Sequence, residues 1–180
     1  MDTRNSARIK NITYSGLFLA IAMVLPFMTG QIPEIGSMLC PMHIPVLLCG
    51  FVCGWPWGLA VGFVAPVMRS LLFGMPKVFP SALAMTFELA AYGALTGLLY
   101  KLLPKKRVNV YVALISSMII GRLVWGVAQF LLQKAVGIDF TLAMFMAGAV
   151  TTALPGIILH IIIIPVLVEI FSRAGLITNK

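Results

Sequence analysis

Six apolar segments follow one another along this chain, separated only by short connections that contain polar residues, glycine or proline. Apolar residues make up 61% of the sequence, charged residues make up 10%, and the mean hydropathy is +1.04. These values lie far outside the range of soluble domains and indicate an integral membrane protein. We expect a single all-α membrane domain over residues 1–180, built as one bundle of six transmembrane helices. The expected spans are residues 12–28, 44–54, 57–73, 81–103, 108–132 and 147–171.

The second segment, residues 44–54, is shorter than the roughly 20 residues that a helix needs to cross a bilayer. The sequence GWPWG at residues 54–58 follows it and predicts a tight turn with tryptophans at the membrane interface. We therefore expect residues 44–54 and 57–73 to form a hairpin. Its first helix should be tilted or partly covered by its neighbours.

The distribution of basic residues predicts the orientation of the bundle. An even number of spans puts both chain ends on one side, and nine of the 13 basic residues lie on that side. Lys and Arg are enriched in cytoplasmic connections, so both termini are expected in the cytoplasm. This bias accounts for the net charge of +8 without a nucleic-acid partner. The outer connections are then residues 29–43, 74–80 and 133–146, which favours a pocket that opens outward. The nine basic residues are Arg4, Arg8, Lys10, Lys101, Lys105, Lys106, Arg107, Arg173 and Lys180.

Three charged residues, Arg69, Glu88 and Arg122, lie inside the expected spans away from the cytoplasmic ends of those spans. A charged group in a membrane helix costs roughly 2.5 kcal/mol or more, so such groups normally face the protein interior or a water-filled cavity. Helical spacing places aromatic and amide side chains on the same faces as Glu88 and Arg122. These side chains are Tyr92, Trp125 and Gln129.

Two interpretations of these charges are open. In the first, the aromatic, amide and charged groups form a small-molecule pocket, and an anionic ligand supplies the charge that one carboxylate cannot give to two arginines. In the second, Glu88 pairs with Arg69 or Arg122 only to hold the bundle together. His160 either faces the pocket or donates to a backbone carbonyl. Further candidate ligand contacts are His43, Lys77 and Thr152.

The sequence contains no constellation that is typical of an enzyme. It has no aspartate pair, no His-Glu metal motif and no Gly-x-Ser-x-Gly elbow, so we expect neither catalysis nor a bound metal. A membrane scaffold protein without a transport role is an alternative to a ligand-binding protein, and ligand-dependent thermal stabilisation separates the two. A self-sufficient secondary transporter is a further alternative, which would show ion-coupled uptake without partner subunits.

Two stretches carry a resemblance to a known family: LCPMHIPVLLCGFVCGWPWGLAVGF at residues 39–63 and GMPKVFPSALAMTFELAAYGALTGLLY at residues 74–100. With the chain length, the six segments and the expected cytoplasmic termini, they resemble the substrate-binding S component of energy-coupling factor (ECF) vitamin transporters. The resemblance implies a subunit of a prokaryotic plasma-membrane importer that captures a vitamin from outside. It also implies association with a transmembrane coupling subunit and two cytoplasmic ATPases. The chain has no G-x-x-x-x-G-K-[ST] phosphate loop, so it binds no cofactor itself and ATP is used by the partners.

The resemblance also implies roles for two further segments. Family members dock on the coupling subunit through small residues four apart on the first helix, and Gly16 and Ala20 have that spacing here. Internal packing of the two residues is the alternative, because small residues generally allow membrane helices to approach closely. Residues 30–42 resemble the family's first loop, which covers the pocket.

The substrate is expected to be a small hydroxylated or amide-bearing anion, with pantothenate favoured. Its carboxylate is expected to take a charge-assisted hydrogen bond from an arginine, while its amide and hydroxyl groups meet Gln129 and Glu88. Arg69 is expected to face the pocket near the outer interface and to read a negative or strongly polar group of the vitamin. Pyridoxine-type vitamins, a thiamin precursor, riboflavin and cobalamin remain alternatives, because Tyr92 and Trp125 suit a flat ring equally well.

Overall fold

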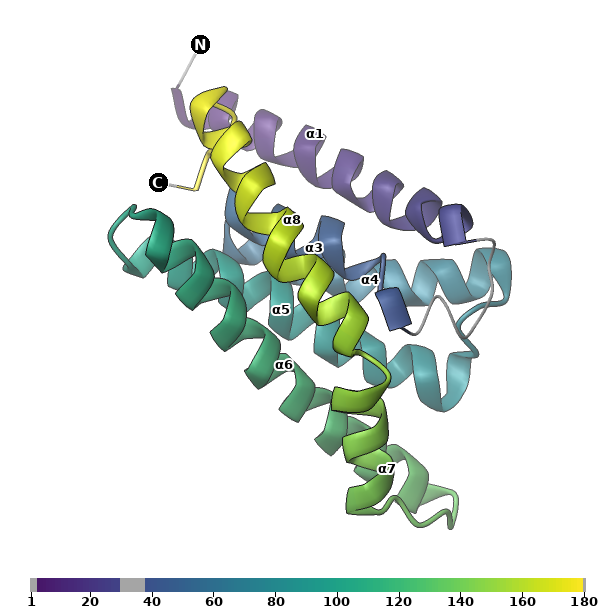
Figure 1. Ribbon diagram of the computed structural model, residues 1–180. Coiled ribbons are helices and arrows are strands. Elements are labelled where there is room, and N and C mark those ends of the chain that lie inside the picture. The colour runs from purple at the N-terminus through teal and green to yellow at the C-terminus, as the bar shows by residue number, and fades with distance from the viewer. Residues whose placement is uncertain (1–2, 30–37, 180) are drawn as a thin grey trace.

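The computed structural model describes residues 3–29 and 38–179, and these residues form helices and connections without a β-strand. The chain folds into one helical bundle (Figure 1). Five segments are long and apolar enough to cross a membrane, namely Ala7–Met28, Trp55–Phe73, Val78–Leu102, Arg107–Ala135 and Leu142–Arg173. The elements in chain order are α1 (Thr3–Val24), η1 (Leu25–Thr29), α3 (His43–Cys53), α4 (Trp55–Phe73), η2 (Val78–Ala82), α5 (Leu83–Leu102), α6 (Arg107–Ala135), α7 (Leu142–Met146), η3 (Ala147–Thr151) and α8 (Leu154–Arg173).

The second expected span is the short helix α3. Its 11 residues correspond to about 16 Å of helix, roughly half the hydrocarbon thickness of a bilayer. All but one of its residues are buried, and α1, α4, α5 and α8 pack around it. The prediction of a short, covered second helix is therefore confirmed, and α3 fills the centre of the bundle instead of facing lipid.

The connection expected at residues 133–146 is shorter than predicted. α6 continues to Ala135, and a helical turn begins again at Leu142, so only residues 136–141 lie between helices. The apolar residues of α7 continue the last span outward, and a break at residues 152–153 separates them from α8. The polar residues on either side of residue 137 led to the expectation of one long connection, so these two helix ends were not predicted.

Glycines hold α4 and α5 close together. A Cβ atom built on Gly93 would lie 2.1 Å from the carbonyl oxygen of Gly58, and one built on Gly62 would lie 2.2 Å from the carbonyl oxygen of Leu89. Real Cβ atoms do not approach carbonyl oxygens so closely, so the two backbones are in direct contact. α5 therefore has a fixed position against α4.

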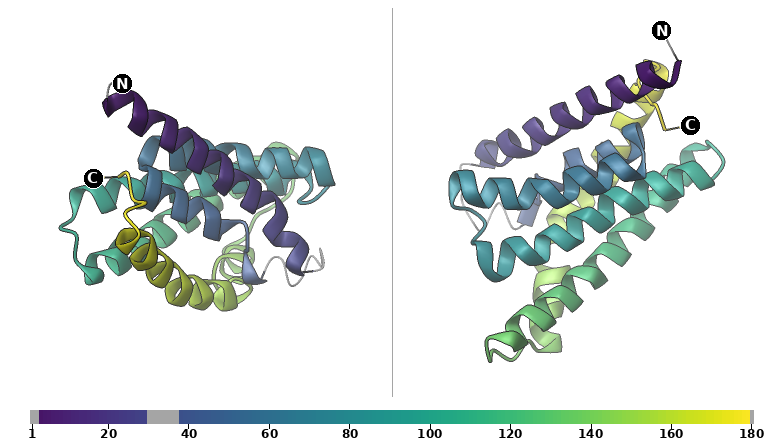
Figure 2. Two further views of the ribbon diagram at one scale, coloured as in Figure 1. Left: turned by 90° about the horizontal axis from the view of Figure 1, so that it is seen from above. Right: turned by 180° about the vertical axis from the view of Figure 1, so that it is seen from behind.

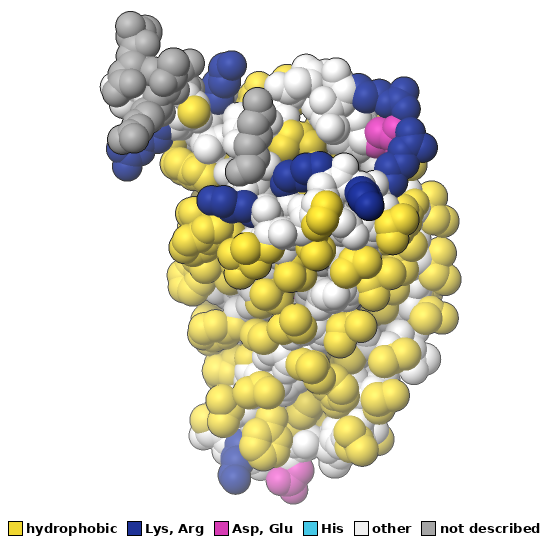
Figure 3. Space-filling view, turned by 90° about the vertical axis from the view of Figure 1, so that its left-hand side faces the viewer, with side chains coloured by type: hydrophobic (Ala, Val, Ile, Leu, Met, Phe, Trp, Pro, Cys, Tyr) yellow, Lys and Arg dark blue, Asp and Glu magenta, His cyan; other side chains and the backbone are white. Residues whose placement is uncertain are grey.

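Both chain ends lie at the same end of the bundle, and α1 and α6 lie on opposite sides of it (Figures 1 and 2). Lys and Arg side chains gather at that end, beyond a wide band of hydrophobic side chains (Figure 3). The C-terminal residues fold back under α3: the amides of Thr178 and Asn179 donate to the carbonyl oxygen of Val52 at 2.9 and 3.0 Å. The side-chain amide of Asn179 donates to Gly97 on α5 at 2.9 Å.

Candidate functional site

A fully buried carboxylate, Glu88 on α5, is the centre of a polar cluster inside the bundle. Its side chain is 1% exposed. Arg122 Nη1 on α6 lies 3.0 Å from Glu88 Oε1, and the hydroxyl of Tyr92 donates to the same oxygen at 3.0 Å. His43 Nε2, at the start of α3, lies 3.6 Å from it. Three helices thus bring a carboxylate, a guanidinium, a phenol and an imidazole side chain together.

A second histidine, His160 on α8, extends this cluster. Its ring stacks on that of His43, with centroids 5.9 Å apart and planes inclined by 20°. Both histidines are 2% exposed. His160 also hydrogen-bonds to the backbone of Cys40, and Arg122 Nη2 lies 3.6 Å from the sulfur of Cys40. The segment before α3 therefore closes one side of the cluster.

Four nitrogen atoms of the cluster are buried without a hydrogen-bond partner among the described residues. They are Nδ1 and Nε2 of His43, Nε of Arg122 and Nε2 of His160. More than nine-tenths of buried polar groups in proteins have a partner, so each exception needs an explanation. Here four exceptions lie on three helices, and one of them, His43 Nε2, is 3.6 Å from the carboxylate, just beyond hydrogen-bond distance. Such an arrangement is typical of a site where a polar molecule makes the missing hydrogen bonds.

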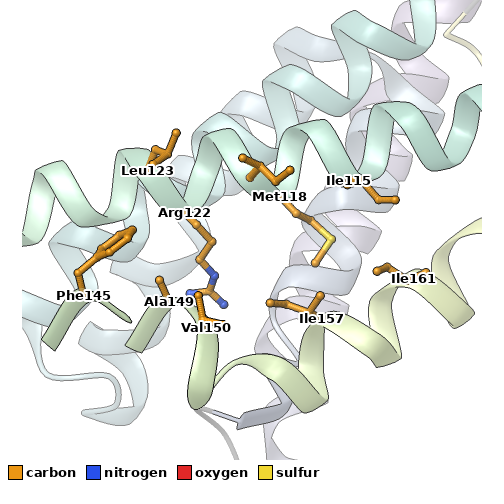
Figure 4. Close-up of a pocket in the computed structure, with 10 residues that line it drawn as sticks. Ile115, Met118, Arg122, Leu123, Phe145, Ala149, Val150, Ile157 and Ile161 are labelled. Atoms are coloured by element: carbon orange, nitrogen blue, oxygen red, sulfur yellow. The ribbon is translucent and has the colours of Figure 1, made fainter. Parts of the chain in front are cut away.

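A cavity of about 260 Å³ lies beside the cluster, between α6 and the segment from α7 to α8. Arg122 is the one charged residue in its wall, and its guanidinium points between the two helices (Figure 4). The remaining wall is apolar and includes Met118, Phe145, Ile157 and Ile161. The polar cluster therefore adjoins a mainly aliphatic surface. Within residues 3–29 and 38–179, no three His, Cys, Asp or Glu side chains are grouped to hold a metal ion.

A comparison with protein families decides the class of this bundle. The family model of the ECF transporter substrate-specific component matches residues 10–168. The chain belongs to this family. Comparisons with curated proteins and with solved structures gave no match. The protein is therefore a multi-pass cell-membrane protein and a substrate-specific S component of an ECF importer, a family that works with ATPases and a transmembrane coupling subunit.

The structure of the S component brings together four of the residues predicted for the pocket: His43, Glu88, Tyr92 and Arg122. His160, which the sequence left between two roles, joins them. Its ring hydrogen-bonds to the backbone of Cys40, and its Nε2 is buried without a hydrogen-bond partner among the described residues. A lone histidine within an apolar span was the only sequence signal for it.

Other predicted residues lie farther along the S component. Trp125 packs against Phe140 and Phe145, with ring centroids 6.1 and 6.3 Å away, where α6 and α7 meet. Gln129 is buried two turns beyond Arg122, about 10 Å along the helix, and accepts a hydrogen bond from Gln133 at 3.1 Å. Their side chains already have partners in the fold.

Two predicted contacts lie near the ends of helices. Thr152 is half-buried in the break between η3 and α8, and its amide donates to the carbonyl oxygen of Ala147 at 2.8 Å. Lys77 is exposed in the connection between α4 and η2. The predicted covering loop, residues 30–42, falls within the described residues only from residue 38 onward.

Of the two pairings of Glu88 that the sequence left open, the structure contains the one with Arg122 and not the one with Arg69. Among the described residues, Arg69 has no ion pair; its Nη1 donates to the carbonyl oxygen of Met23 on α1 at 2.7 Å. Its guanidinium lies over the rings of Phe27 and Phe73, 5.2 and 5.4 Å from their centroids. Within the described part of the chain, the contacts of this buried cation are therefore a backbone carbonyl and two aromatic rings, not a carboxylate.

Proposed function

We propose that this S component captures a small vitamin from outside the cell at the cluster of His43, Glu88, Arg122 and His160, with both termini in the cytoplasm. A coupling subunit and two ATPases then energise its release inside. The observation that carries the proposal is the set of four buried nitrogens without hydrogen-bond partners on His43, Arg122 and His160. In a scaffold protein without a ligand these nitrogens would stay unsatisfied, and each unsatisfied buried polar group destabilises the fold by about 1–3 kcal/mol.

The charges of the cluster bear on the substrate class. The formal charges of Glu88 and Arg122 cancel, and Arg69 contributes its charge elsewhere. The argument for an anionic substrate therefore depends on Arg122 alone, whose Nε remains available as a donor. Pantothenate remains our first candidate, because its carboxylate suits Arg122 and its dimethyl group suits the aliphatic cavity wall.

A neutral hydroxylated ring compound, of the pyridoxine type or a thiamin precursor, is the second candidate. The cancelled charge of the Glu88–Arg122 pair favours it, because a neutral ligand leaves the buried pair electrically balanced. The nitrogens of His43 and His160 offer such a ligand both donors and acceptors.

A thermal-shift panel on the purified protein tests the proposal. We expect one member of the set pantothenate, pyridoxine, thiamin precursor, riboflavin and cobalamin to stabilise it, by about 2.7 kcal/mol at 100 times its Kd. His160→Phe keeps a ring but loses the nitrogens, including the one bonded to the Cys40 backbone, so it should fold with a lower melting temperature and lose the ligand response. Arg173 is exposed, so Arg173→Met is the control and should keep the thermal response to the vitamin. A panel without any stabilising vitamin would contradict vitamin binding.

We also propose that Gly16 and Ala20 form the docking face for the coupling subunit. Both are exposed on α1, and no atom lies within 4 Å of a Cβ atom built on Gly16. Internal packing therefore does not explain them.

Replacing Ala20 with leucine should lower transport by the assembled importer at least ten-fold and leave vitamin binding unchanged, because the side chain separates two helices outside the pocket. Ala143→Leu, an equal change at an exposed position of α7, should transport normally. Normal co-purification of Ala20→Leu with the coupling subunit would contradict the docking role.

A further inference from the structure

Arg69 joins the outer end of α4 to the outer end of α1. Its side chain is buried, with 4% of the residue exposed. The hydrogen bond to Met23 reaches the last turn of α1, and the cation–π contact with Phe27 reaches η1, which continues that helix. Three groups in two segments of the chain thus contact a single guanidinium.

The sequence of α1 explains why a donor is needed there. The α-helix ends at Val24 and continues as a 3-10 helix from Leu25. In a 3-10 turn the carbonyl of residue 23 faces the amide of residue 26, which is Pro26 and carries no N–H. The guanidinium of Arg69 supplies a donor at this carbonyl. Its delocalised charge also suits the contact with the two perpendicular rings of Phe27 and Phe73, which a lysine ammonium makes less well.

The other polar contacts of α1 lie nearer its opposite end. The side chains of Asn11 and Thr178 are hydrogen-bonded at the end that holds both termini. In the middle, Cys49 donates weakly to Ser15 at 3.7 Å. Apolar contacts such as those of Phe18 make up the remaining buried face. In the outer half of α1, the hydrogen bond from Arg69 to Met23 therefore adds a directional contact to this apolar packing.

Arg69 also has a neighbour that extends this connection toward α5. The hydroxyl of Ser70 donates to the carbonyl oxygen of Pro76 at 2.5 Å, in the connection that leads to η2 and α5. Two consecutive residues of α4 thus bind α1 on one side and the connection to α5 on the other. α4 and α5 are in backbone contact, so α1 is the helix that this link holds in place.

We propose that Arg69 is a positioning residue for the docking helix: it fixes the outer half of α1 against α4 so that the face of Gly16 and Ala20 is presented to the coupling subunit. This inference rests on the proposed docking function. It assigns Arg69 no contact with the vitamin, since its Nη1 donates to Met23 and the rings of Phe27 and Phe73 lie against its guanidinium.

The test compares Arg69→Met, Arg69→Lys and the wild type, each purified alone and with the coupling module. In Arg69→Met we expect backbone amide exchange in residues 20–28 to accelerate at least ten-fold, while exchange in α5 and α6 stays unchanged. The fraction that co-purifies with the coupling subunit should fall at least five-fold. Thermal stabilisation by pantothenate, or by whichever vitamin of the panel stabilises the wild type, should stay within two-fold. Arg69→Lys should lie between, because it keeps one donor for Met23.

The outcomes separate this inference from its alternatives. Loss of vitamin stabilisation in Arg69→Met would make Arg69 part of the binding site and overturn the inference, as would normal exchange or normal co-purification. A general rise of exchange in all helices would show a merely structural role, also against it. If Arg69→Met does not fold, Arg69→Gln keeps a single amide donor and is measured in the same way. A wild type that fails to co-purify would instead contradict the docking function itself.

Discussion

Replacing Glu88 with glutamine is expected to lower the free energy of unfolding by about 3–5 kcal/mol. The substitution keeps the size of the side chain but leaves the guanidinium of Arg122 buried without its counter-charge. Tyr92 loses a carboxylate acceptor at the same time. Denaturant unfolding of the purified protein without ligand measures the effect, and calorimetry with the stabilising vitamin should show loss of binding.

Two controls make this expectation specific to the buried pair. Glu169 lies 2.5 Å from both Arg107 and Arg173 at the surface, and Glu169→Gln should leave the unfolding free energy almost unchanged because water solvates these charges. The double variant Glu88→Gln, Arg122→Met should regain more than half of the lost stability, because no unpaired charge remains. It should not regain vitamin binding. A single variant as stable as the wild type would show that Glu88 is not the counter-charge of Arg122.

The long helices were predictable because a bilayer demands long apolar segments. Hydropathy located α1, α4, α5, α6 and α8, and the shortness of residues 44–54 indicated a helix that does not span alone. The limits of α7 were not predictable, since an apolar residue near the interface suits either a helix or a connection. Such ends depend on packing, as between Phe145 and Gly126, where a Cβ atom would lie 2.4 Å from the ring.

The site was predictable where side chains pair with side chains. Helical spacing put Tyr92 one turn from Glu88, and opposite charge pointed to an arginine, which is Arg122. The same reasoning could not choose between Arg69 and Arg122, because both lie in spans next to α5 along the chain. The partner of Arg69 is a backbone carbonyl, and every residue has one. Sequence patterns of charge therefore cannot reveal this contact.

Replacing Gly93 with alanine is expected to lower the free energy of unfolding by about 3 kcal/mol or more, the upper part of the range for overpacked interiors. The added methyl would lie 2.1 Å from the carbonyl oxygen of Gly58, within the backbone of the facing helix. No side-chain rotation relieves a clash with backbone, so α4 and α5 must move apart. Because Tyr92 and Glu88 lie on the same helix, the vitamin response should weaken with the stability.

The matched control is Gly16→Ala, which adds the same methyl to a glycine of α1. A Cβ atom there meets nothing within 4 Å, and alanine favours a helix over glycine by up to about 1 kcal/mol. Gly16→Ala should therefore melt at or above the wild-type temperature, whereas Gly93→Ala should melt well below it. Thermal unfolding of both variants in the same detergent compares them directly. If the two melt alike, the separation of α4 and α5 is not set by backbone contact at Gly58 and Gly93, and the fixed position of Glu88 needs another cause.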